Sequence, residues 1–322
     1  MVYAVHFAGA VLACYLIAQV LTRSTWTYNS PRVAIVCWQA VGLALGLAAI
    51  GLPLSAGLEP YHDGVGNALF RLASGELAPG FGPPHVALVL AGFGVGGVLI
   101  GTTITCGLRA IRAQRRHRDL LTLVARDDPA APGALVLDHP SAAAYCLPGV
   151  RPTVVVSAGT LSLLDRAQLA AVLSHERAHA DERHDLVLLP FTALCRALPW
   201  AGWVRAARDT VALLVEMRAD DRARRHHMDG ALAAALLRFA SAPSRVTPAG
   251  ALGVAGTTPE SPAGLVARPV RPLPITLGIA DNHLDARVRR LLTTGRPPRV
   301  RGAIALGVTA TLVVTTVALF VG

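Results

Sequence analysis

Four long apolar runs are the main feature of the hydropathy pattern along this chain. Each run holds roughly 20 mostly apolar residues, which at about 1.5 Å rise per residue is enough for a helix to cross about 30 Å of hydrocarbon. The stretches between the runs are polar, arginine-rich or amphipathic. We therefore predict four membrane-spanning helices, at residues 2–21, 33–52, 85–108 and 302–321.

A different pattern occupies the region between the third and fourth runs. Short apolar segments rich in β-branched residues predict strands near residues 134–138, 143–147 and 152–157. Longer segments with apolar residues at helical spacing predict helices near residues 166–181, 210–223 and 284–292. This mixture is typical of a small α+β domain. We therefore assign the chain to the α+β class, as a multi-pass α-helical membrane protein that carries such a domain.

The helix at residues 166–181 has the clearest local signal. Asp165 followed three residues later by Gln168 is typical of an N-cap residue with its capping-box partner. Leu169, Val172 and Leu173 then continue at helical spacing. The beginning of this helix is therefore specified by the sequence around it.

Composition agrees with a membrane protein. Hydrophobic residues make up 53% of the 322 residues, and the mean hydropathy of +0.48 is high for a soluble chain. The formal net charge of +10 might suggest nucleic acid, but many of the arginines lie beside the predicted spans and aromatic residues are only 5%. We therefore expect anionic lipid headgroups to face these arginines, and we predict no direct contact with nucleic acid.

The arginines also predict an orientation, because basic residues gather on the cytoplasmic side of a membrane. Arg23 and Arg32 lie between the first and second spans, five arginines follow the third span at residues 109–118, and six precede the fourth at residues 287–301. The loop at residues 53–84 is poorer in arginine and reads as external. We predict a plasma-membrane protein with its amino and carboxyl termini outside and the domain at residues 109–240 in the cytoplasm.

The chemistry suggested by the sequence centres on one short motif. His175, Glu176 and His179 stand in an HExxH run within the predicted helix. Residues four apart share one face of a helix, so both imidazoles can reach a single metal ion, and Glu176 can reach a water in the open position of that metal. This pattern is typical of zinc hydrolases, although five residues with three specified positions also occur by chance.

A catalytic zinc usually has three protein ligands, so one more must come from elsewhere in the chain. Glu216 is the best candidate, because it lies on the later amphipathic helix at residues 210–223. Asp220 follows one turn later on the same face, where it can accept a hydrogen bond from a ligating histidine and fix its tautomer. The alternative is that Glu216 and Asp220 only pair with nearby arginines on a solvated face.

The apolar run at residues 186–204 is too short to be a further pair of spans. A single crossing would separate Glu216 from the two histidines, and a hairpin needs about 40 residues plus a turn. Pro190 and Pro199 also interrupt it. We predict a helix that packs on the domain or lies at the membrane surface, with Trp200 and Trp203 at headgroup level.

The HExxH run and the later Glu-Met-Arg-Ala-Asp run at residues 216–220 together resemble the gluzincin membrane peptidases. The match is nearest to the BlaR/MecR-type metallopeptidases, whose relatives include HtpX and the CAAX prenyl proteases. Residues 144–149 and 152–159 are similar to the strands that lead into the zinc helix of this group. The resemblance covers roughly residues 120–230.

The resemblance implies one catalytic zinc ion, held by His175, His179 and Glu216. It implies Glu176 as the general base that activates the zinc-bound water, and Asp220 as the residue behind the ligands. The BlaR/MecR sensors have a large external ligand-binding domain after the last span, and these 322 residues include none. Any sensing is then expected to use the loop at residues 53–84, the spans or a partner.

These observations predict an integral-membrane zinc endopeptidase that hydrolyses cytoplasmic or membrane proteins. The alternatives are a BlaR/MecR-like transducer that inactivates a repressor protein by proteolysis, and a non-catalytic scaffold, which the presence of Glu176 argues against. The chain then divides into three transmembrane helices at residues 1–108, a zinc metallopeptidase domain at 109–240, a Pro/Gly-rich linker with a short helix at 241–301, and a fourth transmembrane helix at 302–322.

Overall fold

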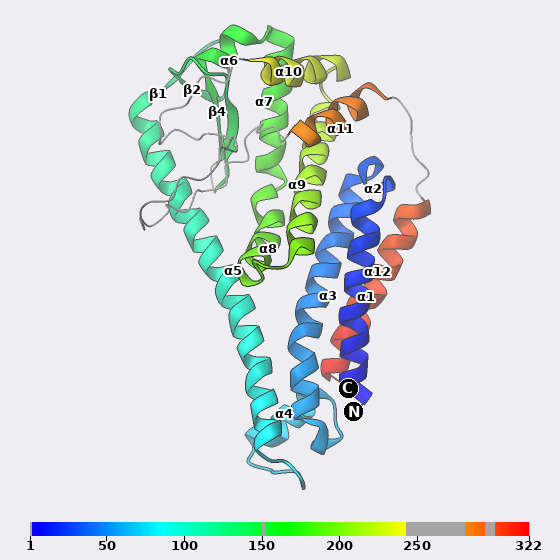
Figure 1. Ribbon diagram of the computed structural model, residues 1–322. Helices are drawn as coiled ribbons and strands as arrows, with labels where there is room; N and C mark the ends of the chain where they lie inside the picture. Colours follow the sequence, from blue (N-terminus) through cyan, green and yellow to red (C-terminus); the bar gives the residue numbers. More distant parts are fainter. Residues whose placement is uncertain (1, 150–151, 243–280, 294–299, 322) are drawn as a thin grey trace, which may run out of the picture. The chain divides into compact units, whose positions relative to one another are not determined.

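Helices dominate the structure, which is a computed structural model that describes residues 2–149, 152–242, 281–293 and 300–321 (Figure 1). The predicted linker falls largely on residues 243–280, which lie outside the described residues. The helices are α1 (Val2–Arg23), α2 (Trp26–Asn29), α3 (Pro31–Gly57), the 3-10 helix η1 (Glu59–Tyr61), α4 (Val65–Ala73), α5 (Pro83–Val124), α6 (Ala158–Leu163), α7 (Arg166–Asp181), α8 (His184–Ala197), α9 (Gly202–Ala223), α10 (Asp229–Ser241), α11 (Asp281–Leu292) and α12 (Val300–Val321). The strands are β1 (Ala125–Asp127), β2 (Ala134–Leu137), β3 (Ala144–Leu147) and β4 (Thr153–Ser157).

The chain forms two compact units. Unit 1 consists of Met1–Cys106, Leu186–Val215 and Arg296–Gly322, and unit 2 of Gly107–Asp185 and Glu216–Gly295. The long helices α5 and α9 each contribute residues to both units. Each unit has its own buried apolar clusters, so each is described separately.

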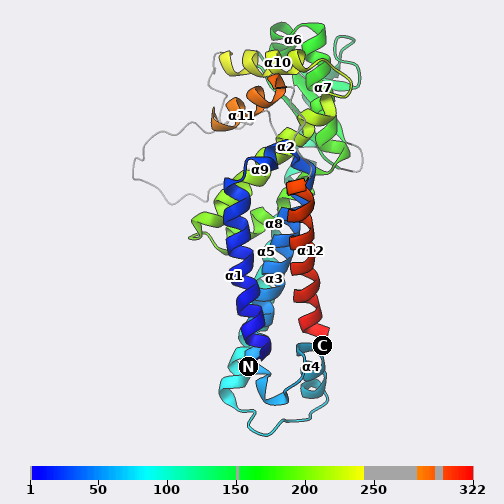
Figure 2. The same cartoon turned by 90° about the vertical axis from the view of Figure 1, so that its right-hand side faces the viewer.

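Four helices are long and apolar enough to cross a membrane: α1, α3, α5 and α12. They coincide with the four predicted spans, which confirms the predicted multi-pass helical class. The third is longer than the sequence suggested, because α5 runs unbroken through the arginine-rich segment to Val124. Arginine has good helix propensity, so charge ends the apolar run without ending the helix. In unit 1, α1 and α12 both pack along α3 (Figure 2).

The core of unit 1 combines aliphatic, aromatic and small residues. Trp38 of α3 meets Phe191 of α8 edge to face, with ring centroids 6.3 Å apart. Gly57 at the end of α3 lets that helix approach the backbone of α5 at His85 and Val89. The segment predicted as one helix at residues 186–204, packed on the domain or at the membrane surface, consists of most of α8, a turn and the start of α9. Its position at a membrane surface stays a prediction.

An apolar cavity of about 890 Å³ lies within unit 1. Its walls are residues of α3, α5, α8 and α12, and they are mainly aliphatic. A cavity with such a lining favours apolar groups over water.

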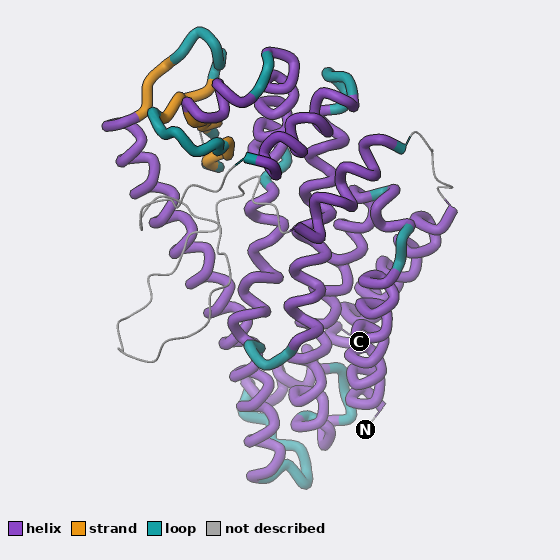
Figure 3. The backbone as a smooth tube through the Cα atoms, turned by 45° about the horizontal axis from the view of Figure 1, so that its top comes forward, coloured by secondary structure: helices purple, strands orange, loops and turns teal. Residues whose placement is uncertain are grey.

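Unit 2 holds the whole described sheet, and Figure 3 shows the strands gathered in one place. The strand order is β1-β2-β4-β3, with β2 and β4 parallel and the other two pairs antiparallel. Val154 and Val156 pack in the cluster that includes α7, whereas Val155 packs with Leu121 of α5 and Tyr145. This alternation is the period of two expected for a strand covered on both faces. It places α7 against one face of the sheet.

Candidate metal centre

The helix α7 begins as the sequence predicts. The side chain of Asp165 accepts a hydrogen bond from the backbone N–H of Gln168 at 2.9 Å, and the Gln168 side chain accepts one from the backbone N–H of Asp165 at 3.2 Å. This reciprocal capping satisfies two backbone donors that the first turn leaves unpaired. One face of α7 packs in the core of unit 2 through Leu169 and Val172. The rigid helix then presents His175 and His179 one turn apart.

Three predicted ligands come together. The Nε2 atoms of His175 and His179 are 3.1 Å apart, and the two carboxylate oxygens of Glu216 lie 3.4 Å from His175 Nε2 and 3.6 Å from His179 Nε2. The donor atoms of these three residues, one from each, all lie within 4.8 Å of one another. Donors about 2.0–2.1 Å from one tetrahedral zinc lie about 3.4 Å from each other. The measured separations therefore fit a metal of this size, and the two imidazoles and a carboxylate are ligands that suit zinc.

The protonation of the two imidazoles also fits a cation. The Nδ1 atom of His175 lies 3.0 Å from Asp220 Oδ1, a short contact that favours a proton at Nδ1 although its alignment is poor for a hydrogen bond. The Nδ1 atom of His179 lies 2.8 Å from Nδ1 of His184. With protons on both Nδ1 atoms, neutral rings direct the lone pairs of their two Nε2 atoms at each other. Such a pair is favourable only when a positive charge lies between the atoms or beside them: a metal ion, a second proton on His175, or the guanidinium of Arg287, whose Nη2 lies 3.5 Å from His175 Nε2.

Glu176 lies in the same buried region, with no well-formed hydrogen bond to its carboxylate. Its side chain is 1% exposed, and neither carboxylate oxygen has a hydrogen-bond partner among the described residues. Burial raises the pKa of Glu176 to about 8, with Glu216 adding to the rise and His175 and Arg287 opposing it. Buried, unpaired polar atoms need an explanation, and a role as general base for a reacting water would supply one.

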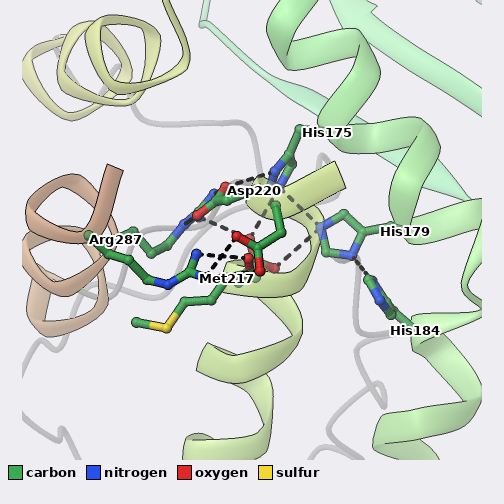
Figure 4. Close-up of polar contacts among 9 residues, drawn as sticks. His175, His179, His184, Met217, Asp220 and Arg287 are labelled. Atoms are coloured by element: carbon green, nitrogen blue, oxygen red, sulfur yellow. Dashed lines mark hydrogen bonds and ion pairs between the residues drawn. The ribbon is translucent and has the colours of Figure 1, made fainter. Parts of the chain in front are cut away.

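The carboxylate of Asp220 is held by Arg287, which in the sequence is one of the arginines that precede the fourth span. The guanidinium of Arg287 donates from Nε to Asp220 Oδ2 at 2.9 Å and from Nη2 to Oδ1 at 2.7 Å, and its Nη1 lies 2.9 Å from Glu216 Oε2. Figure 4 shows the side chain of Arg287 reaching toward Asp220. No local pattern could reveal the contact, since 67 residues separate Arg287 from Asp220.

These contacts set the charge of the centre. Burial alone would raise the pKa values of Glu216 and Asp220, but contacts with basic side chains outweigh it: those with His179 and Arg287 lower the pKa of Glu216 to about 2, and those with Arg287 and His175 hold the pKa of Asp220 well below its ordinary range. Burial lowers the pKa of His175, yet Asp220 and Glu216 raise it to about 9. A metal ion that binds here competes with that proton, so binding is expected to release it.

Residues 110–245 match the model of peptidase family M48. This chain carries an M48 peptidase domain. The family is zinc-dependent, and all five predicted site residues on α7 and α9 lie inside the matched segment: His175, Glu176, His179, Glu216 and Asp220. No curated protein and no solved structure shows significant similarity to the chain. Arg287 lies outside the matched residues, so α11 adds to the centre a contact that the family match does not cover.

Proposed function

We propose that this chain is an integral-membrane zinc endopeptidase, with His175, His179 and Glu216 as zinc ligands. The observation that supports this most directly is the convergence of the three donor groups within 4.8 Å, in a segment that matches a peptidase family. The four long apolar helices support a place in the bilayer. Protein or peptide chains are the substrates that a peptidase domain implies.

The chemistry follows from the groups that the chain provides. When bound, zinc supplies Lewis acidity that polarises the scissile carbonyl and acidifies water. Glu176 accepts the proton of the attacking water and passes it to the leaving amine. Asp220 orients the His175 ring from behind, and Arg287 keeps Asp220 and Glu216 charged and in place.

A peptide substrate can bind along β3. This strand is one of the two edges of the sheet and it packs against α7, which carries Glu176. The backbone of Cys146 in β3 also lies close enough to Glu176 to lower the pKa of its carboxyl group, against the rise that burial causes. An extended peptide added to this edge would be held in register by backbone hydrogen bonds. In a series of peptides that each carry one methylated backbone N–H, binding should then weaken only when the methyl group stands at every second position. Equal weakening at every position would contradict strand addition.

The finer assignment to BlaR/MecR-type peptidases is part of this proposal and rests on the Glu-Met-Arg-Ala-Asp run at residues 216–220. The proposed orientation, with the peptidase domain in the cytoplasm and both termini outside, rests on the arginines beside the spans. Leu77 and Met228 are exposed and suit a test by membrane-impermeant thiol labelling in cells. In a cysteine-free background Leu77→Cys should be labelled and Met228→Cys protected; the reverse pattern would contradict the orientation.

The function itself is tested with the full-length protein in lipid nanodiscs. Zinc is measured per chain, and cleavage is measured on an unstructured protein substrate. Wild type should hold one zinc and cleave; Glu216→Ala should lose most of the zinc. Glu176→Gln should keep the zinc and lose roughly 10²–10⁴-fold in cleavage rate, the usual contribution of a general base. Asp209→Asn, an exposed carboxylate on the same helix as Glu216, is the matched control. A wild type without zinc, or a Glu176→Gln variant with full activity, would refute the proposal.

A further inference from the structure

His184 is a buried histidine that lies directly behind a proposed ligand. It is the first residue of α8 and is 2% exposed. Its Nδ1 atom is 2.8 Å from Nδ1 of His179, and the two rings meet edge to face with centroids 4.8 Å apart. Figure 4 shows His179 between His175 and His184. The ring of His184 thus contacts the side of His179 that faces away from the centre.

The backbone between α7 and α8 places this ring. Arg183 adopts a left-handed conformation with φ of 50°, one of two non-glycine residues with positive φ in the described chain. Left-handed residues commonly end helices, because they reverse the chain and pair the last carbonyls. Here the turn lets the next residue begin α8 with its side chain directed back toward α7. A non-glycine residue in this conformation is uncommon and indicates that the surrounding structure requires it.

Two charged groups fix the far side of the His184 ring. Its Nε2 atom lies 3.5 Å from Glu182 Oε2. The guanidinium of Arg218 on α9 donates to both oxygens of that carboxylate, from Nε at 2.8 Å and from Nη2 at 2.7 Å. Arg218 is two residues from the proposed ligand Glu216, so α9 contributes both a ligand and the anchor of Glu182. Glu182 is held in one position, at ion-pair distance from the ring.

The positions of the protons follow from these contacts. A carboxylate only accepts, so Glu182 favours a proton on Nε2 of His184. The Nδ1 atom of a neutral His184 then carries a lone pair, and the 2.8 Å contact requires His179 to donate from its own Nδ1. That leaves Nε2 of His179 as a lone pair directed at the centre. The opposite arrangement would put a proton on the ligand atom and prevent coordination.

We propose that His184, oriented by Glu182 and Arg218, is a positioning residue that holds His179 in its metal-binding tautomer and ring orientation. This inference rests on the proposed zinc site and goes beyond its ligands. It makes the two ligand histidines unequal. His175 is backed by the charged Asp220, whereas His179 is backed by an uncharged imidazole that accepts one hydrogen bond.

The test compares three substitutions of His184 in the full-length protein by zinc affinity, measured by competition with a chelator. Loss of an outer partner of a metal ligand typically weakens metal binding by roughly 10–100-fold. His184→Ala should show a loss of that order. His184→Gln, whose side-chain oxygen can accept from His179, should regain most of the affinity. His184→Phe fills the space without accepting and should behave like His184→Ala. The exposed His226 provides the matched control, His226→Ala.

A second readout separates positioning from simple packing. The absorption bands of Co²⁺ bound in place of zinc report ligand geometry, and they should change in His184→Ala and His184→Phe but not in His184→Gln. Thermal unfolding identifies any variant that fails to fold. If His184→Ala fails to fold, the comparison of His184→Gln with His184→Phe still decides the question. Glu182→Gln should lower the zinc affinity less than His184→Ala does. The double variant should bind zinc only slightly more weakly than His184→Ala, because both residues act through the contact of His184 with His179.

The outcomes are distinguishable from those of the proposed function, because affinity is measured without catalysis. A wild type that binds no zinc would overturn both proposals. A wild type that binds zinc, with His184→Phe restoring affinity as well as His184→Gln, would overturn this inference and leave the peptidase proposal intact. Zinc affinity that depends on His184 in a protein without cleavage activity would support this inference against the peptidase proposal.

Discussion

Unit 1 and unit 2 bury polar groups in opposite ways. Among the described residues, the buried polar groups of unit 1 are uncharged, and they include the hydroxyl groups of Thr27, Ser55, Thr309 and Thr316 and the indole N–H of Trp38. The buried ionisable residues that bear on charge are all in unit 2, and they are His175, Glu176, His179, His184, Asp220 and Arg287. Burying a charge costs free energy unless it is paired, so a cluster of six is not a device for stability. Unit 1 is therefore held together by the packing of uncharged side chains. Unit 2 contains the buried ionisable groups of the candidate metal centre, and their desolvation costs free energy.

The largest expected effect is in the buried cluster. Arg287→Ala leaves Asp220 without its main partner, and breaking a buried ion pair on one side typically costs about 3–5 kcal/mol. Arg289→Ala on the same helix removes an exposed i,i+4 partner of Asp285, which is worth about 0.3–0.5 kcal/mol. Unfolding followed by circular dichroism in mixed micelles, with zinc chelated, measures both.

The double variant Arg287→Ala with Asp220→Ala sharpens this result. Removing both charges should cost less than the sum of the single changes, since no uncompensated carboxylate remains. Equal destabilisation by Arg287→Ala and Arg289→Ala would mean that burial of the ion pair does not matter, and the contrast between the units would lose its basis.

In unit 1 the corresponding test is to add a methyl group where two helices pack closely, at Gly57. A side chain at Gly57 would meet backbone atoms of α5, His85 O at 2.7 Å and Val89 N at 2.8 Å, which cannot move aside as a flexible side chain can. Gly57→Ala should therefore cost about 1–3 kcal/mol, as overpacking typically does. Gly46, with nothing within 4 Å of an added Cβ, is the control, and Gly46→Ala should be neutral or slightly stabilising. Unfolding in SDS titrations compares the two; equal midpoints would contradict close packing of α3 on α5.

A smaller effect is expected at the N-terminus of α7. Asp165→Ala removes the N-cap acceptor and should cost about 1 kcal/mol. The carboxylate of Asp181 lies at the other end of the same helix, where the helix dipole disfavours it, so Asp181→Ala should be neutral or slightly stabilising. Hydrogen exchange of the first turn should accelerate only in Asp165→Ala. Equal exchange in the two variants would show that the capping box does not hold this helix end.

The smallest effect concerns charges that unit 1 keeps at its surface. The hydrogen bond from Arg71 lowers the pKa of Glu76, with the charge of Arg71 adding to the effect. A carboxyl group whose folded pKa is lowered stabilises the fold above its ordinary value of 4.5, and that contribution is lost as the pH falls through the lowered value. Wild type should be slightly more stable than Glu76→Gln at pH 7, with the difference vanishing in acid. A difference that grows in acid would reverse the sign and contradict the contact.

The elements that local patterns specify were predicted well. The helix over residues 166–181 was anticipated to the residue, because the capping box at Asp165 and Gln168 marks its beginning and apolar spacing marks its face. The strands at β2, β3 and β4 lie within about one residue of the predicted ones, since each is a short apolar run next to turn residues. The four span-length helices follow from composition alone. These features depend on neighbours in sequence, so the sequence displays them.

Contacts between distant residues were not predictable in this way. Arg287 looked like one of many arginines beside a membrane span, and only the fold shows it between Asp220 and Glu216. His184 stands close to the HExxH run, yet its role depends on the left-handed Arg183 that turns it back toward His179. The sheet order, with β3 at an edge, also depends on pairing between strands that are apart in the chain.

The HExxH run, the Glu-Met-Arg-Ala-Asp run and the apolar segments were readable by themselves, and they determined the type of chemistry and the membrane character. Only the tertiary structure decided which charges surround the three donor groups and which imidazole stands behind His179. The physical reason is that ligand identity is a property of single residues at helical spacing. Protonation and orientation, in contrast, depend on burial and on partners that the chain brings together over long separations.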